Sequence, residues 1–160
     1  MPRRIDPRYC NTLIDAHVLD RGGSLDDADV DEILNLAEEG RITLLLPHSV
    51  KSEIEHPNTP PDVKRRAARL VYTRPVQLTP PEIDQHQQVR SILQGNAKPG
   101  KHDSDAYHVV ESAKYGGGYF ITNDSRILKM GPEIATLLKV VIVTPAKFLS
   151  LYRCFDGGAA

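Results

Sequence analysis

The sequence predicts a three-layer α/β/α sandwich with a central, mostly parallel β-sheet. Short apolar segments with the character of buried strands alternate with longer segments of helical periodicity, which is the pattern of α/β domains. The strand segments are almost continuously apolar, as expected where helices cover both faces of a sheet. A chain of 160 residues, 40% of them hydrophobic, suits one domain, which we expect at residues 1–155 with a disordered tail at 156–160.

The first strand is expected in the β-prone run of residues 11–19, where Asp15 stands at the point at which the strand should end. Ser24 is placed to cap the helix that follows, and Gly40 is placed to stop it. Residues 41–46 then form a second apolar strand. The chain therefore opens with a strand, a helix and a strand, and the first strand carries an acid at its carboxyl end.

Pro47 ends the second strand, and Ser49 is placed to cap a helix that carries Glu53 and Glu55. Glu53 lies one helical turn beyond the strand, within reach of the same sheet edge as Asp15. Glu55 is two positions further along and points to another side of the helix. Only Glu53 is therefore expected to belong to a site at this edge.

The next helix is expected to begin at Pro60 or Pro61. Its apolar stripe is expected at Val63, Ala67, Leu70 and Val71. Basic side chains cover the rest of its surface; they are Lys64, Arg65, Arg66 and Arg69. A solvated face is the ordinary interpretation of such a surface. Because few acids are interleaved, contact with a phosphate backbone is the alternative.

Residues 75–78 are expected to form a brief edge strand, followed by a polar helix at residues 80–93. The loop at residues 94–100 contains two glycines and a proline. Lys98 and Lys101 lie in or beside this loop, so that it is suited to close over an anion.

A helix at residues 103–114 carries two acids in its first turn, Asp103 and Asp105. After a glycine-rich break, an apolar strand at residues 119–124 ends on Asp124. The carboxyl ends of parallel strands line the crevice where ligands bind, which places Asp124 at that edge. The helix runs antiparallel to the strand that it precedes, so its first turn lies at the same edge.

The end of the sequence supplies one more strand and helix. A short segment at residues 126–128 is followed by a turn at Gly131–Pro132. The last strand is expected at residues 140–143 and the last helix from Pro145.

Acids from four segments are expected to converge at one edge of the sheet. They are Asp15, Glu53, Asp105 and Asp124, and Asp103 either joins them or caps its helix. Like charges gathered in one place resist ionising together, and a bound divalent cation relieves the repulsion. Carboxylates favour hard cations such as Mg²⁺ or Mn²⁺. A zinc site is disfavoured, because neither a cysteine pair nor a His-Glu-x-x-His spacing occurs.

Short segments around these acids carry a likeness to a known family; they are Ile14–Leu19, Ser52–Ile54, Asp103–Ala106 and Ile121–Asp124. In them the chain resembles the PIN-domain family of metal-dependent nucleases and, more loosely, the toxin members called VapC. The resemblance implies that Asp15, Glu53, Asp105 and Asp124 form the acidic quartet, supported by Thr122 or Asn123. His17 departs from the family pattern, which commonly has a small polar residue at that position.

The resemblance implies a Mg²⁺- or Mn²⁺-dependent endoribonuclease that hydrolyses single-stranded or structured RNA. A metal ion can polarise the attacking water, and a second can stabilise the leaving oxygen. The preference for RNA over DNA rests on the resemblance alone, as does a toxin role with an antitoxin protein as partner. The residues expected to bind RNA are Lys64, Arg65, Arg69, Lys98 and Lys101.

Two other functions stay open at this point. One is a PIN-like module that binds RNA or a protein without cutting, against which the complete acid set argues. The other is a metal-dependent phosphatase, although His17 stands where an aspartyl-phosphate enzyme of the haloacid-dehalogenase type needs its second acid. A homodimer is also left open.

Net charge, cysteine content and the length of apolar runs bear on which partners and which cell compartment to expect. The formal net charge of -1 argues neither for nor against nucleic acid, because separated patches of both signs can cancel. Cys10 and Cys154 are too few for a disulfide framework. No apolar run approaches the roughly 20 residues that span a bilayer, and the amino terminus leads into no hydrophobic signal segment, so a cytoplasmic protein is expected.

Overall fold

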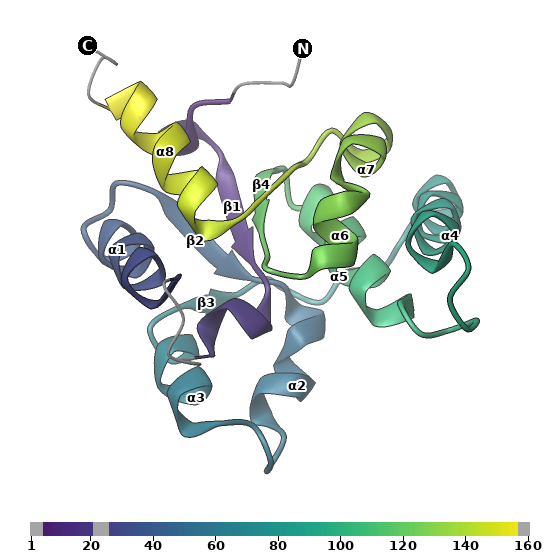
Figure 1. The fold of residues 1–160 in the computed structure, drawn as a ribbon, viewed down its shortest axis with the longest axis horizontal. Helices are drawn as coiled ribbons and strands as arrows, with labels where there is room; N and C mark the ends of the chain where they lie inside the picture. Colours follow the sequence, from purple (N-terminus) through teal and green to yellow (C-terminus); the bar gives the residue numbers. More distant parts are fainter. Residues whose placement is uncertain (1–4, 21–25, 157–160) are drawn as a thin grey trace.

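A five-stranded sheet forms the centre of the structure (Figure 1). The computed structural model describes residues 5–20 and 26–156. The strands lie in the order β3-β2-β1-β4-β5, and every neighbouring pair is parallel. Their bounds are β1 Asn11–Ile14, β2 Thr43–Leu46, β3 Val71–Tyr72, β4 Gly117–Ile121 and β5 Val141–Val143. The predicted fold class is confirmed.

Helices cover both faces of the sheet and connect its strands (Figure 1). The α-helices are α1 Asp26–Glu38, α2 Lys51–Glu55, α3 Pro61–Ala67, α4 Pro80–Gln94, α5 Asp103–Lys114, α6 Ser125–Lys129, α7 Gly131–Leu138 and α8 Pro145–Asp156. Three short 3₁₀ turns accompany them: η1 Pro7–Tyr9, η2 Ala16–Leu19 and η3 His48–Val50. No helix in the described ranges has the length and apolar character needed to cross a membrane.

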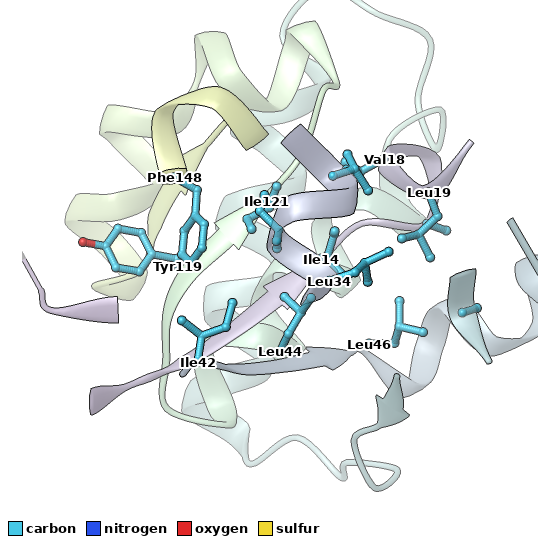
Figure 2. Packing of buried hydrophobic residues seen from close by; sticks show 14 of the residues in the cluster. Ile14, Val18, Leu19, Leu34, Ile42, Leu44, Leu46, Tyr119, Ile121 and Phe148 are labelled. Carbon is cyan, nitrogen blue, oxygen red and sulfur yellow. The ribbon is translucent and has the colours of Figure 1, made fainter. Parts of the chain in front are cut away.

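Successive side chains of the central strands β1 and β4 point to opposite faces and into two separate cores. Ile14 and Ile121 pack with α1 and α8 on one face, as Figure 2 shows for part of this cluster. Leu13 and Phe120 pack with α4, α5, α6 and α7 on the other face. Fully burying one such side chain contributes about 1.5–3 kcal/mol, so both faces of the central strands stabilise the fold.

The strand order creates a switch point between β1 and β4. From β1 the chain builds outward through β2 and β3, and it then returns to place β4 on the other side of β1. Connections that leave neighbouring strands in opposite directions open a crevice at the carboxyl ends of those strands. Asp15 directly follows β1, and Asp124 follows β4. The topology therefore places two of the expected acids on either side of this crevice.

The third strand lies earlier in the chain than expected. Residues 71–72 pair with β2, whereas residues 75–78, expected as an edge strand, lie outside every strand. Val71 was expected in the preceding helix, but α3 ends at Ala67 and Val71 is 68% exposed at the sheet edge. The ladder ends soon after, since Pro75 has no N–H to donate.

The carboxyl-terminal third also departs from expectation in two places. The expected turn at Gly131–Pro132 is the first turn of α7, where a proline needs no intrahelical N–H partner. Asp156 was expected in the tail, but it is the last residue of α8, and its Oδ1 lies 3.8 Å from Nη1 of Arg8. Residues 157–160 and the expected cap Ser24 lie outside the described residues.

The glycine-rich segment before β4 is only partly a break. Gly116 has a φ of 67°, a conformation that favours glycine, and it makes the turn out of α5. Gly117 already begins β4. At Gly118 a Cβ atom would lie 2.5 Å from Sγ of Cys10, so the close approach of that side chain requires glycine.

Candidate functional site

Asp15 lies at the centre of the candidate site, at the carboxyl end of β1. Its side chain is only 2% exposed, and its backbone N–H donates to the carbonyl oxygen of Ile121 at the end of β4, over 2.9 Å. Burial raises the pKa of the Asp15 carboxyl above its usual value, and the charge of Asp105 acts in the same direction. Asp15 is therefore a desolvated acid held at the switch point of the sheet.

Thr122 joins Asp15 to Asp124. Its buried hydroxyl donates to Oδ2 of Asp15 over 3.0 Å and accepts the backbone N–H of Asp124, also over 3.0 Å. This side chain thus fixes the positions of both acids relative to β4. Asn123, the other expected supporting residue, is exposed.

Asp124 is at once a site residue and a helix cap. Its Oδ1 atom accepts the backbone N–H groups of Arg126 and Ile127, each over 2.9 Å, at the start of α6. These bonds satisfy donors that the first turn of a helix leaves without intrahelical partners. They also hold the carboxylate in one orientation beside the sheet edge.

Asp105 lies in the first turn of α5 and faces the other acids. Burial raises the pKa of its carboxyl, and the charge of Asp124 raises it further. His102 opposes this shift from the same helix end, with its Nδ1 3.5 Å from Oδ2 of Asp105. The charge of Asp105 thus acts on Asp15, and the charge of Asp124 acts on Asp105, which links the three acids electrostatically.

Glu53 is held by a histidine that the sequence interpretation missed. Nε2 of His108 lies 3.0 Å from Oε1 of Glu53, and the His108 side chain is buried, with 3% exposed. This hydrogen bond lowers the pKa of Glu53. Burial alone would lower the pKa of His108, but the hydrogen bond and charge of Glu53 outweigh it, so the pKa of His108 is raised. The spacing of Asp105 and His108, three positions apart on one helix, is the signal that could have indicated a shared face.

A buried hydrogen-bond network supports His108 from behind. Its Nδ1 lies 2.6 Å from Oγ of Ser49, and the Ser49 backbone N–H donates to the carboxylate of Glu111 over 3.2 Å. The Thr73 hydroxyl donates to the same carboxylate over 3.4 Å. Ser49 was expected to cap a helix; its hydroxyl instead contacts His108, and the helix-capping positions are Pro47 for η3 and Val50 for α2.

Two neighbouring acids point away from this group. Asp103 accepts a hydrogen bond from Nε of Arg90 over 3.0 Å, in a pair that is about two-fifths exposed. Glu55 lies 3.9 Å from Lys51 on the outer side of α2 and is largely exposed. The expected divergence of Glu53 and Glu55 is therefore present in the structure.

The basic residues of α3 and the turn after it are partly neutralised by neighbouring acids. Arg65 pairs with Asp62, and Arg69 donates to Glu38 over 2.5 Å. Arg66 is buried and contacts α1. Lys64, Lys98 and Lys101, also expected to bind RNA, have exposed side chains.

The side chains of the site do not form a complete metal cage. Within residues 5–20 and 26–156, no three or more His, Cys, Asp or Glu side chains are arranged to hold a metal ion together. Asp15, Asp124 and Glu53 instead accept hydrogen bonds from Thr122, backbone amides and His108. Chemically, the site offers clustered oxygen donors and an adjacent imidazole. Comparisons with protein-family models, curated proteins and solved structures find no match for this chain.

Proposed function

We propose that the chain is a Mg²⁺- or Mn²⁺-dependent endoribonuclease that acts through Asp15, Asp105, Asp124 and Glu53. The observation that supports this most is the grouping of Asp15 and Asp105 at the switch point. The pKa of each of these carboxyls is raised, with burial as the largest cause. Perturbed acids in a crevice at the carboxyl ends of parallel strands are typical of functional sites.

Carboxylate oxygens are the kind of donor that suits a hard divalent cation. Mg²⁺ prefers oxygen ligands, keeps several of its waters and is usually bound by only one or two protein carboxylates together with substrate phosphates. Asp15 and Asp105 are the two acids whose repulsion a cation would relieve, and Asp124 is the third oxygen donor beside Asp105. A complete protein cage is therefore not needed for this proposal.

The residues of the chain have separate roles in the proposed reaction. When bound, the cation supplies polarisation of the scissile phosphodiester and of the attacking water. Asp15 and Asp105 would hold the cation, Thr122 and the α6 amides fix the positions of Asp15 and Asp124, and His108 fixes Glu53. The Glu53 side chain is about two-fifths exposed, more than that of Asp105 or of buried Asp15, which suits it to contact the attacking water.

The resemblance to PIN-domain nucleases supports RNA as substrate, and its VapC members support a toxin role. In that role the activity lies in the cytoplasm and an antitoxin protein is the partner. Exposed Lys98 and Lys101 precede α5, so they lie near the helix that carries Asp105 and are suited to bind the phosphate backbone.

The test is cleavage of a mixed pool of single-stranded and structured RNA, with Mg²⁺ or Mn²⁺ and with chelator. A generic phosphate-ester substrate is assayed in parallel. Metal-dependent release of internal oligonucleotide fragments is the expected result. Hydrolysis of the phosphate ester alone would indicate a phosphatase, and RNA binding without cleavage would indicate a non-catalytic module.

A further inference from the structure

A pocket of about 590 Å³ opens beside the acids, between η2, α2 and the turn that leads into α3. Figure 1 shows these elements next to one another at the end of the molecule occupied by α2 and α3. Glu53 lines the pocket, and so does His17, two positions after Asp15. The pocket therefore adjoins Glu53, one of the four proposed catalytic acids. Its volume falls within the range of small-ligand sites.

The pocket has an apolar floor, and its rim is polar and carries two histidine side chains. Buried Ala16, Ile54 and Val63 contribute the floor. The rim carries the exposed imidazoles of His17 and His56. An apolar surface beside flat rings suits a planar heterocycle, which buries its faces and keeps its edge for hydrogen bonds.

The rim is ordered by its own hydrogen bonds. The Thr59 hydroxyl donates to the carbonyl oxygen of Glu53, and the Thr59 backbone N–H donates to the His56 carbonyl oxygen over 3.0 Å. Nδ1 of His56 accepts the backbone N–H of Asn58 over 3.1 Å. A neutral His56 in this arrangement carries its proton on Nε2 and presents it as a donor. The Asn58 side chain adds an amide donor and acceptor at the rim.

We propose that this pocket binds one unstacked nucleobase of the single-stranded RNA whose phosphate lies at the acids. The substrate class in this inference rests on the proposed function. Unpaired bases in RNA are recognised by stacking on aromatic or histidine rings and by hydrogen bonds to their edges. His17 supplies the stacking ring, and His56 and Asn58 contact the base edge. The pocket thus gives the nuclease a preference for the nucleotide beside the cleaved bond.

The test measures binding in chelator, where no cleavage is needed. Affinities are determined by fluorescence anisotropy for a short single-stranded RNA and for an abasic oligonucleotide of the same length and charge. His17→Ala and Asn58→Ala should weaken binding of the RNA by roughly 5- to 100-fold, the effect of removing the protein's hold on one base. Neither variant should change the affinity for the abasic oligonucleotide.

Two further variants sharpen the result. His17→Phe keeps a ring for stacking and should retain most of the affinity. Asn96→Ala removes an exposed asparagine in the loop between α4 and α5 and should bind both oligonucleotides as the wild type does. Equal losses on the RNA and the abasic oligonucleotide, or no loss on either, would overturn the pocket assignment even if the protein cleaves RNA. Base-dependent losses without any RNA cleavage would support the pocket and refute the nuclease proposal.

Discussion

The imidazole of His108 and the carboxylate of Glu53 lie 3.0 Å apart, although 55 positions separate them in the chain. His108 comes from the middle of α5, and Glu53 comes from the short helix α2. This contact connects the helix that carries Asp105 to the segment that follows β2. Glu53 is about two-fifths exposed, so a buried partner is what restricts its orientation.

Replacing His108 should therefore release Glu53. We expect His108→Ala to lower the rate of RNA cleavage with a smaller effect on KM, because Glu53 is then free to rotate while the other acids stay in place. His108→Gln can still donate one hydrogen bond and should recover part of the rate. Steady-state kinetics on a defined RNA separates the two parameters. A rise in KM with unchanged kcat in His108→Ala would show that His108 acts on substrate binding instead.

The same pair gives a pH dependence of stability. The pKa of Glu53 is lowered from 4.5 by its hydrogen bond to His108, so its contribution is present above that value and is lost on acidification. The pKa of His108 is raised above 6.5, so its contribution is present below that value and is lost as pH rises through the folded-state pKa. The pair should stabilise the fold most between these two values. Urea unfolding should show this gain in the wild type and its loss in His108→Gln.

Thr122 provides a test of how the two strand-end acids are held. Thr122→Val keeps the shape of the side chain but removes the donor to Asp15 and the acceptor for the Asp124 N–H. Leaving these buried groups without partners should cost about 1–3 kcal/mol in the free energy of unfolding. Thr122→Ser restores the hydroxyl and should lie close to the wild type. Equal stability of the Val and Ser variants would show that the hydroxyl bonds contribute little.

The raised pKa values of Asp15 and Asp105 predict that these two carboxyls, unlike Glu53, destabilise the fold when they ionise. For a carboxyl with a raised folded-state pKa, the protonated form is favoured by folding, and this stability is lost as pH rises through that pKa. At neutral pH both charges are therefore destabilising in the absence of a cation. Asp105→Asn should melt at or above the wild-type temperature in chelator.

With Mg²⁺ or Mn²⁺ added, the wild type should melt at a higher temperature than Asp105→Asn. At about 100 times the Kd, binding to the folded state adds roughly 2.7 kcal/mol, or about 5–10 °C in Tm for a chain of this size. Asp105→Asn should gain much less. Asp103→Asn is the matched control, because Asp103 pairs with Arg90 and should leave the metal response intact. A full response in Asp105→Asn with a reduced response in Asp103→Asn would place the cation on the outer side of α5.

Salt dependence distinguishes the two groups of basic residues. Arg65 and Arg69 already contact acids, so Arg65→Gln with Arg69→Gln should change the log-log salt slope of RNA binding little. Lys98→Gln with Lys101→Gln should lower it by up to roughly 0.7 for each single-strand phosphate that the variant no longer neutralises. A larger drop in the salt slope for the Arg65/Arg69 variant than for the Lys98/Lys101 variant would place the RNA along α3.

The positions of the acids at the strand ends could be predicted from the sequence, because they depend only on the local apolar pattern and on the parallel topology of the sheet. Asp15 and Asp124 come just after apolar runs, and parallel strands bring such positions to one edge. His108 could not be identified in this way, since a histidine among the apolar residues of a helix also fits a buried core position. Its role depends on contacts with Ser49 and Glu53, 59 and 55 positions away, which no periodicity encodes.

The errors in the fold have similar local causes. Val71 fits the apolar spacing of the helix before it, and only pairing with β2 shows it to be a strand residue. The Gly131–Pro132 pair fits a turn and a helix start equally well. Ile134 decides between them, because it is fully buried against the sheet face that α7 covers.

The central proposal is tested most directly by removing one charge at a time from the acid group. Asp15→Asn, Asp105→Asn and Asp124→Asn each keep a hydrogen-bond acceptor, so Thr122 and the α6 amides retain their partners. With Mg²⁺ or Mn²⁺ present, each should abolish cleavage of single-stranded RNA while circular dichroism shows an intact fold. Glu55→Gln, on the outer side of α2, should cleave at the wild-type rate. Wild-type cleavage by all three Asn variants would contradict the assignment of this site.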